Sequence, residues 1–272
     1  MTETGESALV FLNADAAAGE EDRAFVAVVR SREEFQRWLS ASPPQLQWLQ
    51  VEELLCDSEA WAAAAQGTSD VPLDVVMSNP EAEFSQLYRL VDVRAARDVR
   101  VSIPAAPGFG KAVRLAASLG LPIRILPGQP TEEVLAQLEQ VAEFYLRDPM
   151  VEAPIEPFHS LLAAQRGGGS ETLWRILEVD PDVFARFDAN GHAILPRSTQ
   201  PAPPMFVRSH LSHLLERGAE CALCPWQESC AGYFKWPDPK YSCGGVKQLF
   251  ARIKAAADEL TEDLADTEKL TQ

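Results

Sequence analysis

The sequence predicts an α/β protein in which a parallel βα repeat is followed by a small cysteine-rich module. Three observations lead to this class. Short runs rich in β-branched residues alternate with amphipathic helical stretches between about residues 25 and 150. The alternation stops there, and segments rich in glycine and proline follow. Four of the five cysteines then lie together between residues 221 and 243.

The β-branched runs mark the predicted strands, and a stretch of helical period follows most of them. Strands that are regularly separated by helices pair in parallel through crossover connections. A repeat of roughly 25 residues and about five βα units suits either an open doubly wound sheet or a partial barrel. The predicted strands are Phe25–Val29, Leu46–Val51, Pro72–Met77, Val99–Pro104 and Pro122–Leu126.

Capping signals predict the ends of several helices. Ser31 and Glu34 have the spacing of a capping box. Thr131 is placed to begin the longest helix of the repeat, and Gly120 to end the helix before it. The segment Gly108-Phe109-Gly110-Lys111 follows a strand, but it matches neither phosphate-loop motif, so an ordinary strand-to-helix turn is favoured.

The chain divides into three predicted segments. Residues 1–165 form the repeat domain, residues 166–204 a hairpin and linker, and residues 205–272 the cysteine-rich module with a C-terminal amphipathic helix. The hairpin is predicted to turn at Asp188–Gly191, with Val183–Phe187 and His192–Leu195 as its arms.

Composition narrows the function classes. The 40 acidic and 24 basic residues give a formal charge of -16, which disfavours binding to a nucleic-acid backbone. The N-terminus has no secretory signal pattern, and no apolar stretch is long enough to span a bilayer. We therefore expect a soluble cytoplasmic protein without a nucleic-acid or membrane partner.

The cysteine cluster has the spacing C-x2-C-x5-C-x12-C and predicts a metal site formed by Cys221, Cys224, Cys230 and Cys243. Four thiolates can complete a zinc site or hold the corners of a 4Fe-4S cluster. Zinc ribbons usually pair two CxxC knuckles, so the single CxxC favours the cluster, with zinc as the alternative. Five aromatic residues should wall the site, namely Trp226, Tyr233, Phe234, Trp236 and Tyr241. The fifth cysteine, Cys56, is interpreted as a buried small hydrophobic residue on a helix.

The start of this cluster resembles a known family. C-x2-C-x5-C with Pro225 after the second cysteine and Ala231-Gly232 after the third is similar to the core of the SPASM domain. SPASM domains are auxiliary iron-sulfur modules of radical SAM enzymes that modify peptides and proteins. The family pattern continues with x3-C and a further cysteine, and it usually holds two clusters.

The resemblance implies ligands residue by residue. Cys221, Cys224 and Cys230 match the first three cysteines and Cys243 the distal one, so these four would ligate one auxiliary 4Fe-4S cluster. Phe234 stands where the family has its x3 cysteine. The upstream cysteines of a second cluster are missing as well, so we expect one cluster only.

The resemblance also implies that the βα repeat is a partial barrel like that of radical SAM proteins. The CxxxCxxC loop that generates radicals in that family is absent, because Cys56 is the only cysteine before residue 221. We therefore expect a non-radical accessory protein in peptide modification of the RiPP type. It would bind a precursor peptide or a partner enzyme such as a radical SAM protein. Whether it is itself a subunit of an enzyme complex stays open.

Other functions remain open. The protein could be a zinc-stabilised structural or interaction protein. It could be a stand-alone enzyme that uses Glu152, Glu156 and His159 as acid and base, although such residues are more often solvated loop groups. His210 and His213 share a helix face but make only a weak metal site. A RecB-like nuclease with Cys56 as the distant ligand is disfavoured, because no Glu-x-Lys occurs and the charge is acidic.

Overall fold

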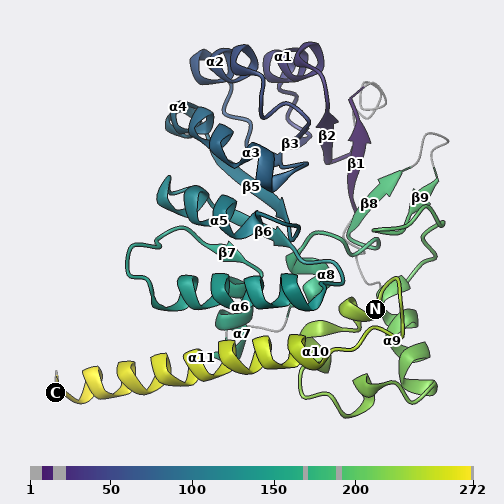
Figure 1. The fold of residues 1–272 in the computed structure, drawn as a ribbon. Helices are drawn as coiled ribbons and strands as arrows, with labels where there is room; N and C mark the ends of the chain where they lie inside the picture. Colours follow the sequence, from purple (N-terminus) through teal and green to yellow (C-terminus); the bar gives the residue numbers. More distant parts are fainter. Residues whose placement is uncertain (1–7, 15–22, 168–170, 188–191, 271–272) are drawn as a thin grey trace.

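The computed structural model describes residues 8–14, 23–167, 171–187 and 192–270 (Figure 1). Its centre is one nine-stranded sheet in the order β7-β6-β5-β4-β3-β2-β1-β8-β9. Every neighbouring pair is parallel except β8 and β9. The strands are β1 (Leu9–Asn13), β2 (Phe25–Val29), β3 (Leu46–Glu52), β4 (Leu73–Val76), β5 (Val99–Pro104), β6 (Ile123–Leu126), β7 (Ile155–Glu156), β8 (Phe184–Phe187) and β9 (Ala193–Ile194). The predicted α/β class is confirmed.

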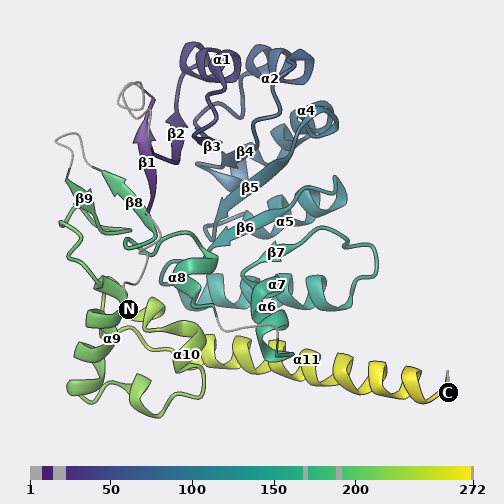
Figure 2. The same ribbon diagram turned by 180° about the vertical axis from the view of Figure 1, so that it is seen from behind.

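Helices connect the consecutive parallel strands from β2 to β7, as crossovers between parallel strands require (Figures 1 and 2). The helices of the repeat are α1 (Arg32–Ala41), α2 (Ser58–Gln66), α3 (Pro80–Glu83), α4 (Leu90–Ala96), α5 (Phe109–Ser118) and α6 (Glu132–Arg147). Those that follow are α7 (Phe158–Gln165), α8 (Leu173–Ile176), α9 (Phe206–Glu216), α10 (Gln227–Cys230) and α11 (Gly244–Leu270). Short 3-10 helices lie at Phe84–Arg89, Glu220–Leu223 and Tyr233–Lys235.

The five predicted strands are confirmed to within about two residues, and so are the main capping signals. Ser31 and Glu34 form the capping box of α1. Thr131 caps α6 by accepting a hydrogen bond from the backbone N–H of Val134. The strands β1 and β7 were not predicted, because β1 precedes the regular repeat and β7 has only two residues beside Pro154.

Gly108 begins α5 with a backbone φ of +81°, a conformation that other residues adopt at a cost. A Cβ atom at this position would lie 2.6 Å from the Cα atom of Glu81 in α3. The glycine therefore allows the close approach of α3 and α5, as an ordinary strand-to-helix turn of this kind requires.

The predicted hairpin is present as β8 and β9, and its turn at residues 188–191 lies outside the described residues. The hairpin does not stand apart from the repeat. Strand β8 pairs in parallel with β1, with Phe11 opposite Arg186, and so extends the main sheet. The segment 166–204 thus contributes two strands to the central sheet.

The two faces of the sheet differ, because successive residues of a strand point to opposite sides. One face packs in the main core, and the other carries a small apolar cluster of Phe11, Val26 and Val28 on β1 and β2 beside a polar part. Apolar residues such as Leu49, Val75 and Ile103 form the main core with the helices of the repeat. The opposite side of β3 to β6 and β8 is called the polar face below, and it is defined by Gln50, Asp74, Arg100, Ser102, Arg124 and Arg186.

The C-terminal helix α11 packs along α6 and α7 and then extends beyond them in both views (Figures 1 and 2). Its apolar residues Val246, Leu249, Phe250 and Ile253 belong to the main core. No helix among the described residues combines the length and the apolar character needed to cross a bilayer.

Candidate metal centre

The four clustered cysteines come from successive turns of the C-terminal module and face one cavity. Cys221 lies in the 3-10 helix Glu220–Leu223, and Cys224 follows it directly. Cys230 ends α10, and Cys243 immediately precedes α11. Together with Trp226, Val246 and Phe250 they line a cavity of about 20 Å³. The chain thus gathers the predicted ligand set at one place.

The turn after α10 directs backbone N–H groups toward Cys230. Ala231 and Gly232 both have left-handed backbone conformations, with φ of 45° and 75°. Tyr233 and Phe234 follow, and their backbone N–H groups donate hydrogen bonds to the thiol of Cys230. N–H groups that point at sulfur favour its thiolate form. This turn therefore suits a metal-ligating cysteine.

A partly buried ion-pair group lies beside the same cavity. Glu220 accepts hydrogen bonds from the Nζ atoms of Lys235 at 2.7 Å and Lys247 at 2.5 Å. It also accepts a hydrogen bond from the backbone N–H of Cys243 at 3.1 Å. Burial opposes the ionisation of Glu220, but the bonds from the two lysines outweigh it and lower its pKa to about 2. The two ammonium groups supply positive charge beside the four thiols.

Three of the four thiols, those of Cys221, Cys230 and Cys243, have raised pKa values. Burial raises the pKa of Cys230 to about 11 and that of Cys243 to about 12. Metal ions bind thiolates and release these protons. Four soft sulfur donors around one cavity, with positive charge beside them, fit a 4Fe-4S cluster or zinc in their chemistry. Within the described residues, no group of three or more His, Cys, Asp or Glu side chains is placed so that it could hold a metal ion, so the four thiols line one cavity without forming a ready coordination geometry.

The cysteine-rich module is fixed to the loop at the carboxyl end of β6. The side-chain amide of Gln129 donates to the backbone carbonyls of Phe234 and Asp238 at 2.9 and 2.8 Å. The hydroxyl of Tyr241 donates to the carbonyl of Pro130. The indole of Trp174 donates to the carbonyl of Ala231. These bonds hold the cysteine loops rigidly against the sheet.

Of the five predicted wall aromatics, Trp226 lines the cavity and packs on Phe250, with ring centroids 5.6 Å apart. Tyr233 and Phe234 are buried in the main core. Trp236 contacts Phe206 and His210. The aliphatic side chain of Val246 lines part of the cavity, where the sequence predicted aromatic side chains.

The prediction for Cys56 was wrong. The residue is exposed and lies in the turn before α2 instead of within a helix. The reason is that Asp57 caps α2 by accepting hydrogen bonds from the backbone N–H groups of Glu59 and Ala60. The helix begins after this cap, and Cys56 is left outside it.

Two of the acid and base candidates, Glu156 and His159, lie close to Tyr145, and Glu152 lies elsewhere, in a groove. Glu156 accepts hydrogen bonds from the backbone N–H and the hydroxyl of Ser160 at the start of α7. His159 is hydrogen bonded to the hydroxyl of Tyr145 at 2.8 Å. Glu152 lines a groove at the amino ends of the strands.

The two histidines of α9 differ, since His210 packs among aromatic rings and His213 is exposed. His210 stacks on Phe206 and is hydrogen bonded to the backbone carbonyl of Gly232. Burial lowers the pKa of this imidazole, so it stays neutral at neutral pH. His213 lies one turn further along α9.

Sequence reasoning missed an ion-pair network on the polar face. Asp74, which is 1% exposed, accepts hydrogen bonds from the hydroxyl of Ser102 at 2.5 Å and from the guanidinium groups of Arg100 and Arg124. Glu178, after α8, binds the same two arginines from the other side. The signal was present in the sequence, since each strand places one charged residue within a β-branched run.

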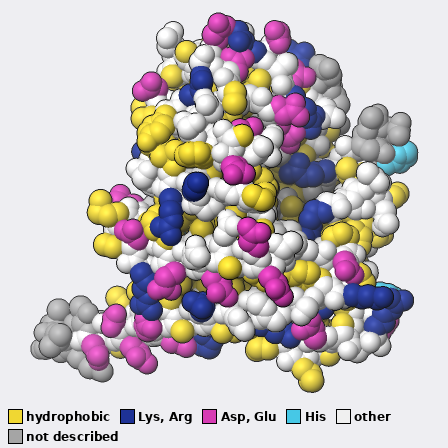
Figure 3. All heavy atoms as spheres, in the orientation of Figure 1, with side chains coloured by type: hydrophobic (Ala, Val, Ile, Leu, Met, Phe, Trp, Pro, Cys, Tyr) yellow, Lys and Arg dark blue, Asp and Glu magenta, His cyan; other side chains and the backbone are white. Residues whose placement is uncertain are grey.

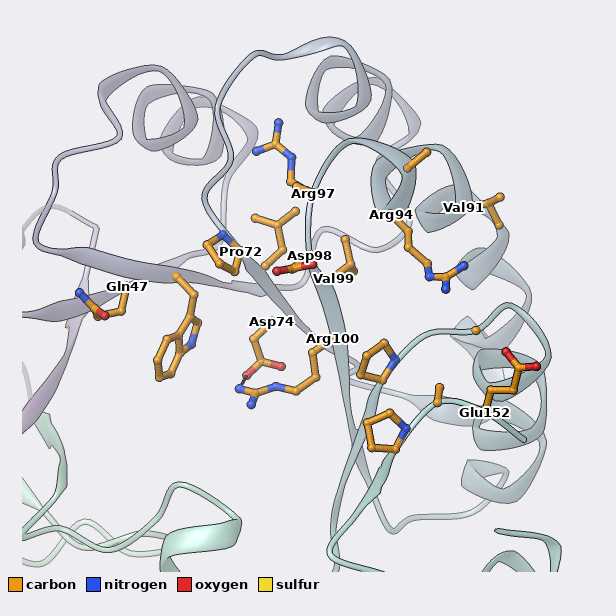
Figure 4. Close-up of a pocket in the computed structure, with 17 residues that line it drawn as sticks. Gln47, Pro72, Asp74, Val91, Arg94, Arg97, Asp98, Val99, Arg100 and Glu152 are labelled. Carbon is orange, nitrogen blue, oxygen red and sulfur yellow. Dashed lines mark hydrogen bonds and ion pairs between the residues drawn. The ribbon is translucent and has the colours of Figure 1, made fainter. Parts of the chain in front are cut away.

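A groove of about 900 Å³ runs along the amino ends of β3 to β7 (Figure 4). Asp74 and Arg100 point toward each other at one side of it. Arg97 points away from this pair and donates to the carbonyl of Ala64 at the end of α2. Arg94 and Glu152 lie toward its other end.

No family model, curated protein or solved structure matches the chain. The functional assignment therefore rests on the residues and their arrangement.

Proposed function

We propose that Cys221, Cys224, Cys230 and Cys243 hold one 4Fe-4S cluster and that the protein is a non-radical accessory protein in peptide modification. The observation on which this proposal depends is that all four cysteines of the C-terminal module line one cavity. Cysteines that share no ligand are not expected to line the same cavity. The irregular spacing, with one CxxC only, favours the cluster over a zinc ribbon.

The surroundings of the thiols suit a bound anionic cluster. Four thiolates and a cluster core with a charge of about +2 together have a net negative charge. Nearby ammonium groups can offset this charge. Lys235 and Lys247 supply such groups, and Lys235 is only 5% exposed. The N–H groups directed at Cys230 give further stabilisation of the thiolate form.

The order of the strands supports the scaffold part of the proposal. From β1 to β7 each strand neighbours the next one in the sequence, which is the order of a βα barrel and not of a doubly wound sheet. A partial barrel followed by a cysteine module is the arrangement implied by the resemblance to SPASM-containing radical SAM proteins. Since the CxxxCxxC loop is absent, this chain would assist a catalytic partner instead of generating radicals.

A surface feature beside the cysteines supports a protein partner. Leu223, between Cys221 and Cys224, is 95% exposed. An exposed leucine beside the proposed cluster would gain free energy from burial against a partner, which would bring that partner close to the cluster. The acidic chain would favour a partner that presents a basic surface.

Metal analysis of anaerobically purified protein tests the cluster directly. We expect about four irons and four sulfides per chain and a broad absorbance near about 400 nm. Colourless protein with stoichiometric zinc would instead support the alternative of a structural zinc site. Protein that lacks both iron and zinc and has all four thiols titratable would refute both.

Replacing Leu223 with aspartate tests the partner role. Leu223→Asp should leave the iron content unchanged. It should weaken the capture of a CxxxCxxC-containing protein from the native cell extract by about tenfold or more, because the new carboxylate would be buried in the interface at a cost in free energy. The matched control is Leu264→Asp on the projecting part of α11, where the leucine is 49% exposed. Equal capture by both variants would contradict docking at Leu223, whereas loss of iron would assign Leu223 to the folding of the module.

A further inference from the structure

Arg186 on β8 differs from the other arginines of the polar face, because none of the described carboxylates forms an ion pair with it. Its Nη2 atom donates to the side-chain oxygen of Gln50 at 3.2 Å. Its guanidinium group lies 3.9 Å from the ring centroid of Phe11. Burial, followed by repulsion from Arg124, lowers the pKa of Arg186 to about 10, so it remains charged at neutral pH.

The polar face has one positive charge in excess. Arg100, Arg124 and Arg186 face the two carboxylates of Asp74 and Glu178, and these two are bonded to Arg100 and Arg124. The nearby carboxylate of Glu52 is paired with Arg30 at 2.7 Å. Among the described residues, the polar face thus keeps one guanidinium group without an ion-pair partner, which matches the charge of one monovalent anion.

Two further donors beside Arg186 have no acceptor. The indole N–H of Trp48 and the Nε–H of Arg100 are buried without a hydrogen-bond partner among the described residues. A buried donor without an acceptor is unfavourable. The ring of Trp48 lies between the ring of Phe11 at 5.9 Å and the guanidinium of Arg100 at 5.7 Å. The two unmet groups are therefore donors, and they lie beside the edge-to-face pair of Phe11 and Trp48.

The region is reachable from solvent. Figure 3 shows a hollow between the central strands and the β8–β9 part of the molecule, with basic side chains on its walls. Trp48, Asp74 and Arg100 also line the groove at the amino ends of the strands. Trp48 and Arg186 are both partly exposed.

We propose that the polar face binds a monocarboxylate, with its carboxylate on Arg186 and its apolar part against Trp48. A guanidinium group binds a carboxylate through two parallel hydrogen bonds. The single excess charge favours a monoanion over a phosphate dianion, and the aromatic rings favour an apolar body. The carboxylate could belong to a free acid or to an acidic residue of a peptide. This site is separate from the cysteine cavity and does not depend on a metal there.

Calorimetric titration of the full chain at low ionic strength tests the site, with benzoate as the probe and neutral benzamide and inorganic phosphate as comparisons. Benzoate should bind at least about tenfold more tightly than either, because only benzoate combines one negative charge with an aromatic ring. A second titration uses a peptide that contains one glutamate and the same peptide with glutamine at that position. It distinguishes a free acid from an acidic residue of a peptide as the source of the carboxylate. Binding of benzoate alone indicates a free acid, and binding of the glutamate peptide indicates a peptide.

Arg186→Gln should weaken the binding of the carboxylate by about tenfold or more, and Trp48→Phe by about threefold to tenfold through loss of one donor. Arg94→Gln is the matched control, because Arg94 lies at the other end of the groove and donates to the carbonyl of Leu119. Should Arg186→Gln fail to fold, phenylglyoxal labelling of Arg186 in the unaltered protein should be slowed by benzoate and not by benzamide. Absence of carboxylate binding, tighter binding of phosphate, or equal affinities in all variants would overturn the proposal.

Discussion

Replacing Cys243 with serine is expected to abolish iron binding and to destabilise the C-terminal module by about 3 kcal/mol or more, because the free energy of metal binding contributes directly to folding. Cys243 is buried at the start of α11, and its backbone N–H also donates to Glu220. Cys230→Ser should have the same effect under the proposed function, since Cys230 at the end of α10 and Cys243 before α11 line the same cavity. Iron analysis and thermal unfolding under anaerobic conditions measure the two effects.

Cys56→Ser is the matched control for these variants. Cys56 is exposed in the turn before α2, so its replacement should change the stability by less than about 0.5 kcal/mol and leave the iron content unchanged. If Cys243→Ser retains its iron, Cys243 is not a ligand. If Cys56→Ser loses iron, the distant cysteine takes part after all, as in the RecB-like arrangement.

Local sequence patterns predicted the repeat well because each strand there is a β-branched run with a helix after it. Strand β1 lies outside that repeat, and β7 is too short for any periodicity. The pairing of β8 with β1 joins segments that are far apart in the sequence. No local pattern reveals such a pairing, which explains why the hairpin was assigned to a separate linker and not to the main sheet.

The two sites differ in how far the sequence reveals them. Cysteine is rare, so four of them within 23 positions are enough to predict a site from the sequence alone. The polar face is formed instead by common residues that occur one in each strand, such as Asp74, Arg100 and Arg124. Parallel register places them side by side, with Asp74 opposite Arg100 and Ser102 opposite Arg124. The register, which the sequence does not show, creates the network.

Glu178 shows a further limit of prediction. Its backbone lies in the left-handed region, with φ of 56°, which is unfavourable for glutamate. This conformation accompanies the position of its carboxylate against Arg100 and Arg124. Strained residues are often found at functional sites. The strain at Glu178 agrees with a polar face that serves binding and not only stability.

Replacing Arg124 with methionine should destabilise the protein by about 3–5 kcal/mol at pH 7, since the buried carboxylate of Asp74 loses one of its two guanidinium partners. Burial alone would raise the pKa of Asp74, but Arg124 and Arg100 outweigh it and keep the pKa below its usual value. The folded state of the natural protein therefore favours the ionised form. This contribution to stability is present above the unfolded pKa of about 4 and is lost as the pH falls through the lower folded pKa.

The variant should show the opposite dependence on pH. Without Arg124, burial becomes the larger influence and should raise the folded pKa of Asp74 above the unfolded value. Protonation then stabilises the folded variant, so the difference in unfolding free energy between the two proteins should shrink as the pH falls from 7 to about 4. Urea unfolding at several pH values measures this difference. The double variant Asp74→Asn with Arg124→Met should recover part of the loss at pH 7, because it leaves no buried charge at position 74. A loss that stays constant with pH would show that Arg124 acts through packing and not through its charge.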